Sequence, residues 1–330
     1  MIRVRPLVVA AALPFVVACA PAVTDGGPVT RAAGPASGSA PAVAGRAPHG
    51  AGTTPMAARG PRPKIPRGTT AGYVVFDRQT GRTALRHAEH RKFRSASVVK
   101  ILIAIDLLES GKPLSAADRA LLKSMLRASD DDAATTFWRR GGERRIIQRT
   151  AKRLGLKDTL PPPIYKPGFW GYTSLSASDI VTTYRYLLDR ADPKVSELIL
   201  GHLRKAAKCG KDGFDQSFGI PSAVPRPFAV KQGWSGFGTT PPVRCREGSG
   251  GVRGAFAGAL SAVPAGRSAS RLDQIVVPDL GRPVLHTTGL AGKGERLVMV
   301  LLTAHPAGTS WQESVRRTTD LTRQIHRAAS

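Results

Sequence analysis

One stretch constrains the fold of this chain more than any other: an apolar helix that carries a lysine one turn after a serine. Eight of the eleven residues at positions 98–108 are Val, Ile or Leu, so this helix is apolar on nearly all sides and should be buried. A buried Lys100 is costly unless it is paired or has a lowered pKa. Because residues three apart share one helix face, Ser97 and Lys100 can meet as a nucleophile and its base.

The same pair has a plainer interpretation, in which Ser97 caps the helix and Lys100 extends its charged end to water. A Ser-x-x-Lys pair arises by chance about once in a chain of this composition. The chemical interpretation therefore depends on partners elsewhere in the sequence. The first helical turn would also offer unpaired backbone N–H groups to a developing oxyanion.

The N-terminus has the pattern of an export signal. Residues 1–6 form a short basic segment, and residues 7–17 form an apolar run too short to span a membrane. The following Ala18-Cys19 resembles a bacterial lipobox, in which the cysteine becomes lipidated; the alternative is an ordinary signal peptide with an incidental cysteine. We expect a signal peptide over residues 1–19, with Cys19 lipidated. The protein would then be exported and lipid-anchored on the outer face of the bacterial cytoplasmic membrane.

The charge is strongly basic, with 49 Lys and Arg against 23 Asp and Glu, a formal +26. The basic residues are spread along the chain, which indicates a solvated surface near anionic lipid or wall polymer. Neither a basic stripe nor a known motif supports nucleic-acid binding. The seven histidines show no metal-ligand spacing, so we predict no cofactor and no metal, and we expect a monomer.

Two further cysteines, Cys209 and Cys245, remain after the lipobox. In an oxidising compartment an even pair suggests one disulfide, and the alternative is two unpaired buried thiols. They bracket the strand that carries Lys231, so a bridge would clamp that strand.

The remaining elements predict an α+β fold with an antiparallel sheet formed from both chain ends and a helical region inserted between them. Residues 20–67, rich in Ala, Pro and Gly, read as a disordered tether before a domain at 68–330. Within the domain, residues 245–283 read as a disordered insertion between neighbouring strands. The expected strands are 71–77, 82–87, 227–234, 283–289 and 296–303. The expected helices follow the organising one at 114–125, 131–139, 143–154, 176–188, 193–208 and 311–328.

Two more motifs gain meaning beside Ser97 and Lys100. Ser129 lies between two expected helices, where it could pass a proton to a leaving nitrogen or simply act as an N-cap. Lys231-Gln232-Gly233 lies on a late strand, where the lysine could hold a substrate carboxylate or be a cation on an edge strand. The glycine would allow close approach of backbone.

In order and spacing these motifs resemble the serine β-lactamase and penicillin-binding protein superfamily, which carries Ser-x-x-Lys, Ser-Asp-Asn and Lys-Thr-Gly. The resemblance covers roughly residues 68–328. It implies that Ser97 is the acylated nucleophile, Lys100 its base and Ser129 a proton shuttle. The implied substrate-binding residues are Asp131, Lys231, Gln232, Gly233 and Trp234, with the backbone N–H groups of Ser97 and Trp234 as the oxyanion hole.

The sequence also departs from that pattern. Asp131 replaces an Asn and can only accept hydrogen bonds when ionised, although it could pair with Lys100. Gln232 replaces a hydroxyl residue. Class A β-lactamases use a loop Glu to activate the deacylating water, and residues 161–171 contain no acid. The sequence therefore predicts a β-lactamase-like serine hydrolase, penicillin-binding or acting on peptidoglycan peptides, with poor β-lactam turnover. The alternative is an inactive lipoprotein that uses the fold as a binding module.

Overall fold

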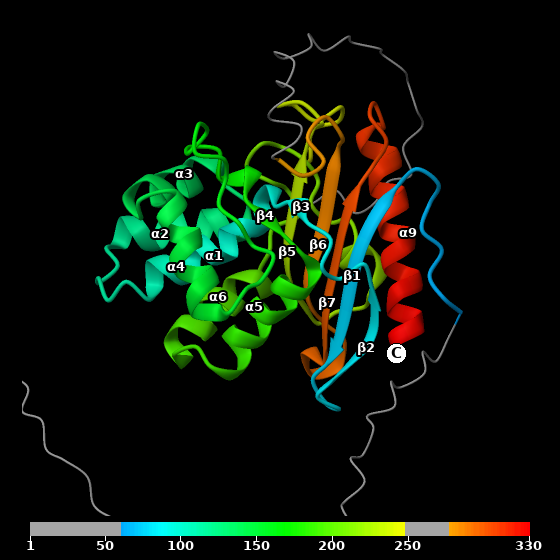
Figure 1. Ribbon diagram of the computed structural model, residues 1–330, viewed down its shortest axis with the longest axis horizontal. Coiled ribbons are helices and arrows are strands. Elements are labelled where there is room, and N and C mark those ends of the chain that lie inside the picture. The colour runs from blue at the N-terminus through cyan, green and yellow to red at the C-terminus, as the bar shows by residue number, and fades with distance from the viewer. Residues whose placement is uncertain (1–60, 248–276) are drawn as a thin grey trace, which may run out of the picture. The chain divides into compact units, whose positions relative to one another are not determined.

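A five-stranded antiparallel sheet stands at the centre of the fold, and both ends of the domain contribute strands to it (Figure 1). The computed structural model describes residues 61–247 and 277–330. The strand order is β2-β1-β7-β6-β5, so β5 is an edge strand. The strands are β1 (Thr70–Asp77), β2 (Arg82–His87), β5 (Phe228–Ser235), β6 (Val284–Ala291) and β7 (Leu297–Ala304).

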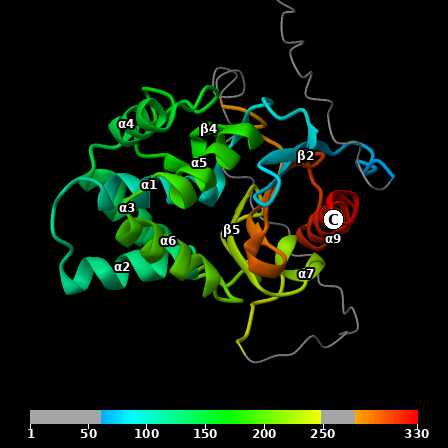
Figure 2. The same cartoon turned by 90° about the horizontal axis from the view of Figure 1, so that it is seen from below.

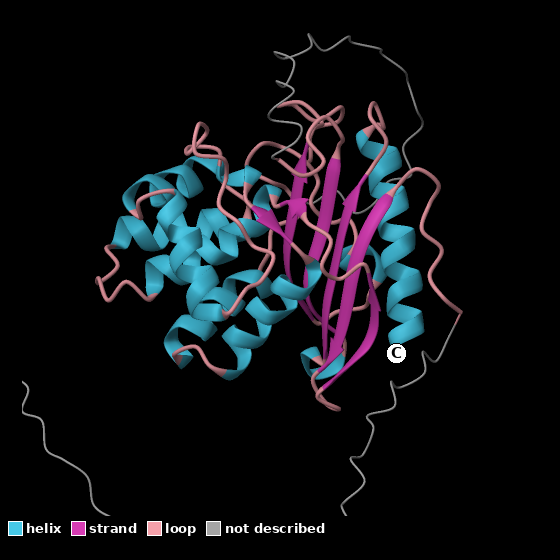
Figure 3. Cartoon of the chain, in the orientation of Figure 1, coloured by secondary structure: helices cyan, strands magenta, loops and turns pink. Residues whose placement is uncertain are grey.

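Seven helices lie between β2 and β5. The first six cover one face of the sheet, and the seventh, α7 (Ile220–Ala223), covers the other face together with α9 (Trp311–Ala329) (Figures 1 and 2). The six inserted helices of the first face are α1 (Lys100–Leu108), α2 (Ala116–Arg127), α3 (Asp131–Arg140), α4 (Arg144–Leu154), α5 (Ala177–Asp189) and α6 (Pro193–Arg204). Short 3-10 turns are η1 (Ala96–Val99), η2 (Trp170–Tyr172) and η3 (Lys293–Glu295). The separation of strands and helices in Figure 3 confirms the predicted α+β class.

Alternating side chains divide each strand between two apolar cores. On β1, Val74 and Phe76 pack with the inserted helices, whereas Tyr73 and Val75 pack with Leu321 and the rest of the α9 side. The helix α1 is buried, as its apolar composition predicts, and lies within the larger core. The sheet is therefore covered on both faces, and its edge strand β5 reaches the start of α1.

Three details differ from the sequence prediction. Helix α6 ends at Arg204 rather than near 208, because the chain turns there and the Ala207 backbone N–H bonds to the Arg127 carbonyl. A two-stranded sheet pairs β3 (Phe93–Arg94) with β4 (Ser174–Leu175); strands of two residues are too short to show a periodic pattern.

The third difference concerns the predicted insertion at 245–283. Its last part is described and packed: Val277 is buried, and Asp279 binds Arg91. The flanking strands β5 and β6 pair directly. Residues 248–276 lie outside the described residues, as do 1–60, which include the predicted signal peptide, Cys19 and most of the tether. Within the described ranges, no helix combines the length and apolar character needed to cross a membrane.

Candidate active site

Ser97 lies in the 3-10 turn η1, directly before α1, and is largely buried. The preceding Ala96 has φ +45°, a conformation that costs free energy for a residue with a side chain and that persists where surrounding structure enforces it. The strand β5 supplies that constraint at Gly233. A Cβ on Gly233 would lie 3.1 Å from the Ser95 carbonyl oxygen and 3.2 Å from the Ser97 backbone nitrogen, so a larger residue would push the turn away.

Lys100 is fully buried, and its Nζ is the centre of the site. It donates hydrogen bonds to Ser97 Oγ at 2.9 Å, to the Ser129 carbonyl oxygen at 2.6 Å and to Asp131 Oδ1 at 2.6 Å. It also lies 4.7 Å from the centre of the Trp170 ring. Burial lowers the pKa of Lys100, and the Asp131 carboxylate acts in the opposite direction. The interpretation of Lys100 as a lysine extending to water is therefore wrong.

Ser129 connects Lys100 with the second lysine. Its Oγ accepts hydrogen bonds from Lys100 Nζ at 3.2 Å and from Lys231 Nζ at 2.9 Å. The N-cap of α3 is Asp130, whose side chain accepts from the backbone N–H groups of Asp132 and Ala133, so Ser129 is not the cap. Ser129 has φ +55°, a second strained residue within this cluster.

Lys231 comes from the edge strand β5, but its side chain is buried rather than solvated. Burial, together with repulsion from the nearby Lys100, holds the pKa of Lys231 well below its ordinary value. A continuous hydrogen-bonded path thus runs from Ser97 through Lys100 and Ser129 to Lys231. A buried amine of lowered pKa can take a proton from a hydroxyl, and a hydroxyl between two amines can both accept and donate one.

Ser97 opens onto a cavity of about 420 Å³. Aromatic side chains form much of its wall, and two acids, Asp131 and Asp212, also line it. Asp212 was not predicted. Its Oδ2 accepts from Trp234 Nε1 at 3.0 Å and its Oδ1 from the Phe214 backbone N–H at 3.1 Å, while burial raises the pKa of its carboxyl. Nothing in the local sequence marks Asp212, because its place in the cavity depends on the path of a loop without regular structure.

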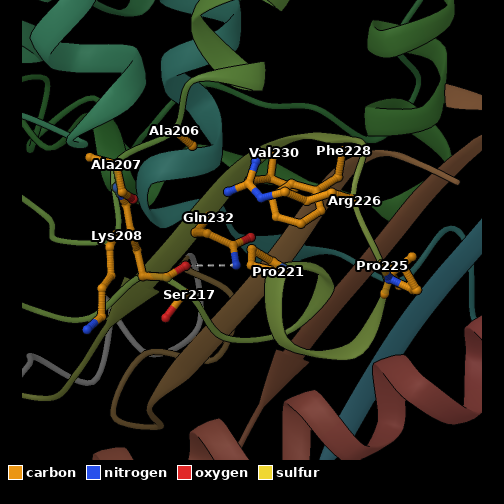
Figure 4. Close-up of a pocket in the computed structure, with 12 residues that line it drawn as sticks. Ala206, Ala207, Lys208, Ser217, Pro221, Pro225, Arg226, Phe228, Val230 and Gln232 are labelled. Atoms are coloured by element: carbon orange, nitrogen blue, oxygen red, sulfur yellow. Dashed lines mark hydrogen bonds between the residues drawn. The ribbon is translucent and has the colours of Figure 1, made fainter. Parts of the chain in front are cut away.

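Gln232 points away from this cavity. Its Nε2 donates to the carbonyl oxygens of Gln216 at 3.2 Å and Phe218 at 2.5 Å, and the side chain is buried. It lines a separate cavity of about 450 Å³ (Figure 4). Side chains that follow one another on a strand face opposite sides, so Gln232 cannot share the orientation of Lys231. The prediction that Gln232 contacts substrate beside Lys231 therefore does not agree with its position.

A disulfide joins Cys209 to Cys245, with their Cα atoms 5.5 Å apart. This confirms the predicted bridge, and the alternative of two unpaired thiols is wrong. The Cys245 backbone N–H also bonds to the Gly213 carbonyl oxygen at 2.8 Å. The bridge thus ties the loop that carries Asp212 to the segment that follows β5.

The loop at 161–171 covers the cluster of Ser97, Lys100 and Ser129 and places Trp170 beside Lys100. Trp170 Nε1 donates to Thr135 Oγ1 at 3.1 Å, and Trp138 Nε1 donates to the Pro167 carbonyl oxygen at 2.8 Å. These bonds to α3 hold Trp170 against Lys100. The loop brings aromatic surface and no carboxylate to the cavity.

Solved structures with the same fold are class A β-lactamases and related proteins. PBP-A, in a mutant form captured as an acyl-enzyme complex with penicillin G, matches with a TM-score of 0.53 over 80% of this chain and 91% of its own, at 14% identity. A class A β-lactamase from Mycobacterium abscessus matches with a TM-score of 0.51 over 79% and 94%, at 18% identity. The fold is therefore the β-lactamase fold, as predicted.

Sequence comparison gives relatives that are named as lipoproteins rather than as enzymes. A stretch of 175 residues is 37% identical to LppW of Mycobacterium tuberculosis and of Mycobacterium bovis, a protein whose name gives it as a proposed lipoprotein. The match covers 51% of this chain and 54% of LppW, so the chain spans about half the length of these relatives. No protein-family model matches the chain.

Proposed function

We propose that this protein is an acyl-transferring serine hydrolase of the bacterial cell envelope, with Ser97 as its nucleophile. The observation that carries the proposal is the hydrogen bond of 2.9 Å between Ser97 Oγ and the Nζ of the fully buried Lys100. A serine activated by a desolvated amine is a recurrent device of nucleophilic catalysis. The β-lactamase fold supports the same assignment.

In the acylation step, neutral Lys100 accepts the proton of Ser97 Oγ while that oxygen bonds to the substrate carbonyl carbon. The backbone N–H groups of Ser97 and Trp234 hold the oxyanion. The carbon–nitrogen bond then breaks, and Ser129 gives its proton to the leaving nitrogen. Ser129 regains a proton from Lys100, with which it shares a hydrogen bond. The products are an acyl ester on Ser97 and a free amine.

Deacylation requires a water molecule whose oxygen bonds to the ester carbon while the Ser97 oxygen leaves and regains a proton. The covering loop at 161–171 offers no acid to activate that water. We therefore expect penicillin to acylate Ser97 and the resulting acyl ester to be hydrolysed slowly. The substrate would be an acylated small molecule or a peptidoglycan peptide. Lipidation at Cys19 would anchor the protein on the outer face of the cytoplasmic membrane, and the name of LppW supports this location.

The test is covalent labelling of Ser97. The chain carrying Cys19→Ala is incubated with a fluorescent penicillin, and its intact mass is followed over time beside a Ser97→Ala control. A persistent adduct that the control lacks is expected. An adduct that appears and disappears with product release would contradict the slow deacylation.

A matched pair of variants tests why deacylation is slow. Phe169 lines the cavity, whereas Ile164 in the same loop is 77% exposed. Phe169→Glu should shorten the lifetime of the adduct, and Ile164→Glu should not. Equal lifetimes in both variants would show that the missing acid is not the cause.

A catalytically inactive binding module is the second candidate. It is favoured by the contact of 2.6 Å between Asp131 Oδ1 and Lys100 Nζ, because a charged lysine is no base. Absence of any adduct on Ser97, with a folded protein, would support it.

A further inference from the structure

The cavity at Ser97 differs in charge from the rest of this basic protein. The chain carries a formal +26, yet none of the described residues lining the cavity is a lysine or an arginine. Two of them, Asp131 and Asp212, are acids. A ligand in the cavity therefore meets carboxylates first, whatever charge the outer surface carries.

Two lysines beneath the cavity, Lys100 and Lys231, are directed away from it, and Lys166 lies over the rings of Phe169 and Tyr172. Lys231 Nζ donates to Ser129 Oγ at 2.9 Å and to the Gln232 carbonyl oxygen at 3.1 Å, and the residue is 1% exposed. Lys100 Nζ is bonded to Asp131 Oδ1 at 2.6 Å. Neither lysine presents its Nζ at the cavity wall, so the cavity lacks an obvious partner for a substrate carboxylate.

Arg94 lies behind Gly236 and is also buried, with both terminal guanidinium nitrogens bonded to backbone carbonyls. Its guanidinium donates to the carbonyl oxygens of Arg282 at 2.6 Å, Ser235 at 3.3 Å and Asp279, and the residue is 2% exposed. These backbone contacts tie the end of β5 to the segment that precedes β6. They leave the Arg94 charge buried rather than available to a ligand.

Asp212 is held so that it can bind a cation. The Trp234 indole and the Phe214 backbone N–H each donate to one of its oxygens, and the Cys209–Cys245 bridge fixes the loop that carries it. An ionised carboxylate has about four acceptor positions, so two donors leave room for a ligand. The Asp131 side chain is 66% exposed although one oxygen binds Lys100, so it can contribute to the same cation.

Aromatic faces complete the cavity. Phe169, Trp170, Tyr172 and Trp234 all line it. The electron-rich face of an aromatic ring attracts cations. Lys100 Nζ lies 4.7 Å from the centre of the Trp170 ring, and Lys166 Nζ lies 5.5 Å from that of Phe169, so the Trp234 ring beside Asp212 is the face left for a ligand. Carboxylates and aromatic faces around one cavity are complementary to an ammonium or guanidinium group.

We propose that the Ser97 cavity selects a cationic group on its ligand, with Asp212 as the principal partner. On the proposed function, the substrate is an amine-bearing peptide or ester whose ammonium lies next to the acyl group that Ser97 attacks. The same cavity disfavours a carboxylate at that position through like-charge repulsion. Penicillins carry a carboxylate, so we expect them to bind weakly before they acylate Ser97 and to need a high concentration to form the adduct.

The test measures binding without turnover. The full chain carrying Cys19→Ala and Ser97→Ala is titrated into three dansylated Gly-Xaa-Gly amides, with Xaa as Lys, Gln or Glu, and fluorescence anisotropy is followed. We expect the Lys probe to bind about tenfold more tightly than the Glu probe, with Gln between them. The overall charge of the protein would favour the Glu probe, so a preference for Lys must arise in the cavity.

Asp212→Asn should remove most of that preference, because the amide oxygen can still accept from Trp234 while the charge is lost. Asp189→Asn removes an equal charge from the exposed end of α5 and should change nothing. Equal binding of all three probes, or tighter binding of the Glu probe, overturns the proposal, and so does a preference that survives Asp212→Asn. Because this assay needs no acylation, its result is independent of whether Ser97 forms an adduct.

Discussion

Two buried groups of ionisable residues in this protein differ in which protonation state their surroundings favour. In the sheet, the buried Asp77 accepts two hydrogen bonds from Arg296, at 3.0 and 2.5 Å, and this pairing lowers the pKa of Asp77 to about 2. At the candidate site, the pKa values of Lys100 and Lys231 are lowered by burial. The first group favours its charged forms, and the second disfavours them.

The difference follows from the number of partners. Asp77 and Arg296 are matched one to one and join β1 to the start of β7. The two lysines share Ser129, and only Lys100 has a carboxylate in contact. A matched pair stabilises a fold, whereas strongly shifted groups in a cavity are typical of functional sites. Substitution of Asp77 or Arg296 should therefore change stability and not Ser97 acylation, whereas substitution of Lys100 should change acylation and not stability.

The largest effect is expected from Lys100→Met. Loss of the base should lower the rate of Ser97 acylation about 10³-fold. Thermal stability should change little, because the carboxylate left without its partner, Asp131, is 66% exposed. The rate is measured as adduct formation with a fluorescent penicillin. Lys112→Met, at an exposed lysine, is the control. A rate within tenfold of the original would mean that Lys100 is not the base.

Removal of the disulfide should affect both stability and the loop of Asp212. Cys209→Ala with Cys245→Ala opens a link across 36 residues, which should lower the free energy of unfolding by about 4 kcal/mol. Urea unfolding measures this loss. In the parent chain carrying Cys19→Ala, thiol titration after unfolding without reductant should find no free thiol. Two free thiols would contradict the bridge.

Asp77→Asn tests the matched pair. It should lower the free energy of unfolding by about 2 kcal/mol at pH 7 and leave Ser97 acylation unchanged. Because folding lowers the pKa of Asp77 to about 2, its contribution is present above about pH 4 and is lost as the pH falls through 2. Denaturant titrations at a series of pH values should therefore show the two proteins converging in acid. A constant difference down to pH 2 would contradict the assignment.

Asp131→Asn tests the unmatched group and should have the smallest effect. Asp131 raises the pKa of Lys100, so its removal should lower that pKa further and move the rise of the acylation rate to lower pH. Below the midpoint the rate should increase several-fold, up to about tenfold for a shift of one pH unit. Acylation is measured across pH 5.5 to 10, with Asp132→Asn as the control. If the midpoint of the rate–pH profile moves to higher pH instead, Asp131 does not raise the pKa of Lys100.

Regular elements were predictable because their patterns are long. The hairpin β1–β2, the apolar α1 and the three late strands all agree with the predicted ranges within a few residues. The pair β3–β4 was missed because two residues show no period. The orientation of Gln232 was misjudged, although alternation along the strand places it opposite Lys231. Asp212 carried no local signal at all.

The sequence by itself determined that Ser97 and Lys100 could meet, because their spacing is one helical turn and the helix around them is too apolar to remain exposed. It also marked Cys209 and Cys245 as a pair. Only the tertiary structure decided that Ser129 and Lys231, 102 residues apart, share a hydrogen bond, and that Asp131 pairs with Lys100. The pKa of a lysine depends on everything packed around it, and residues distant in the chain become neighbours only when the sheet and the helices close over the site.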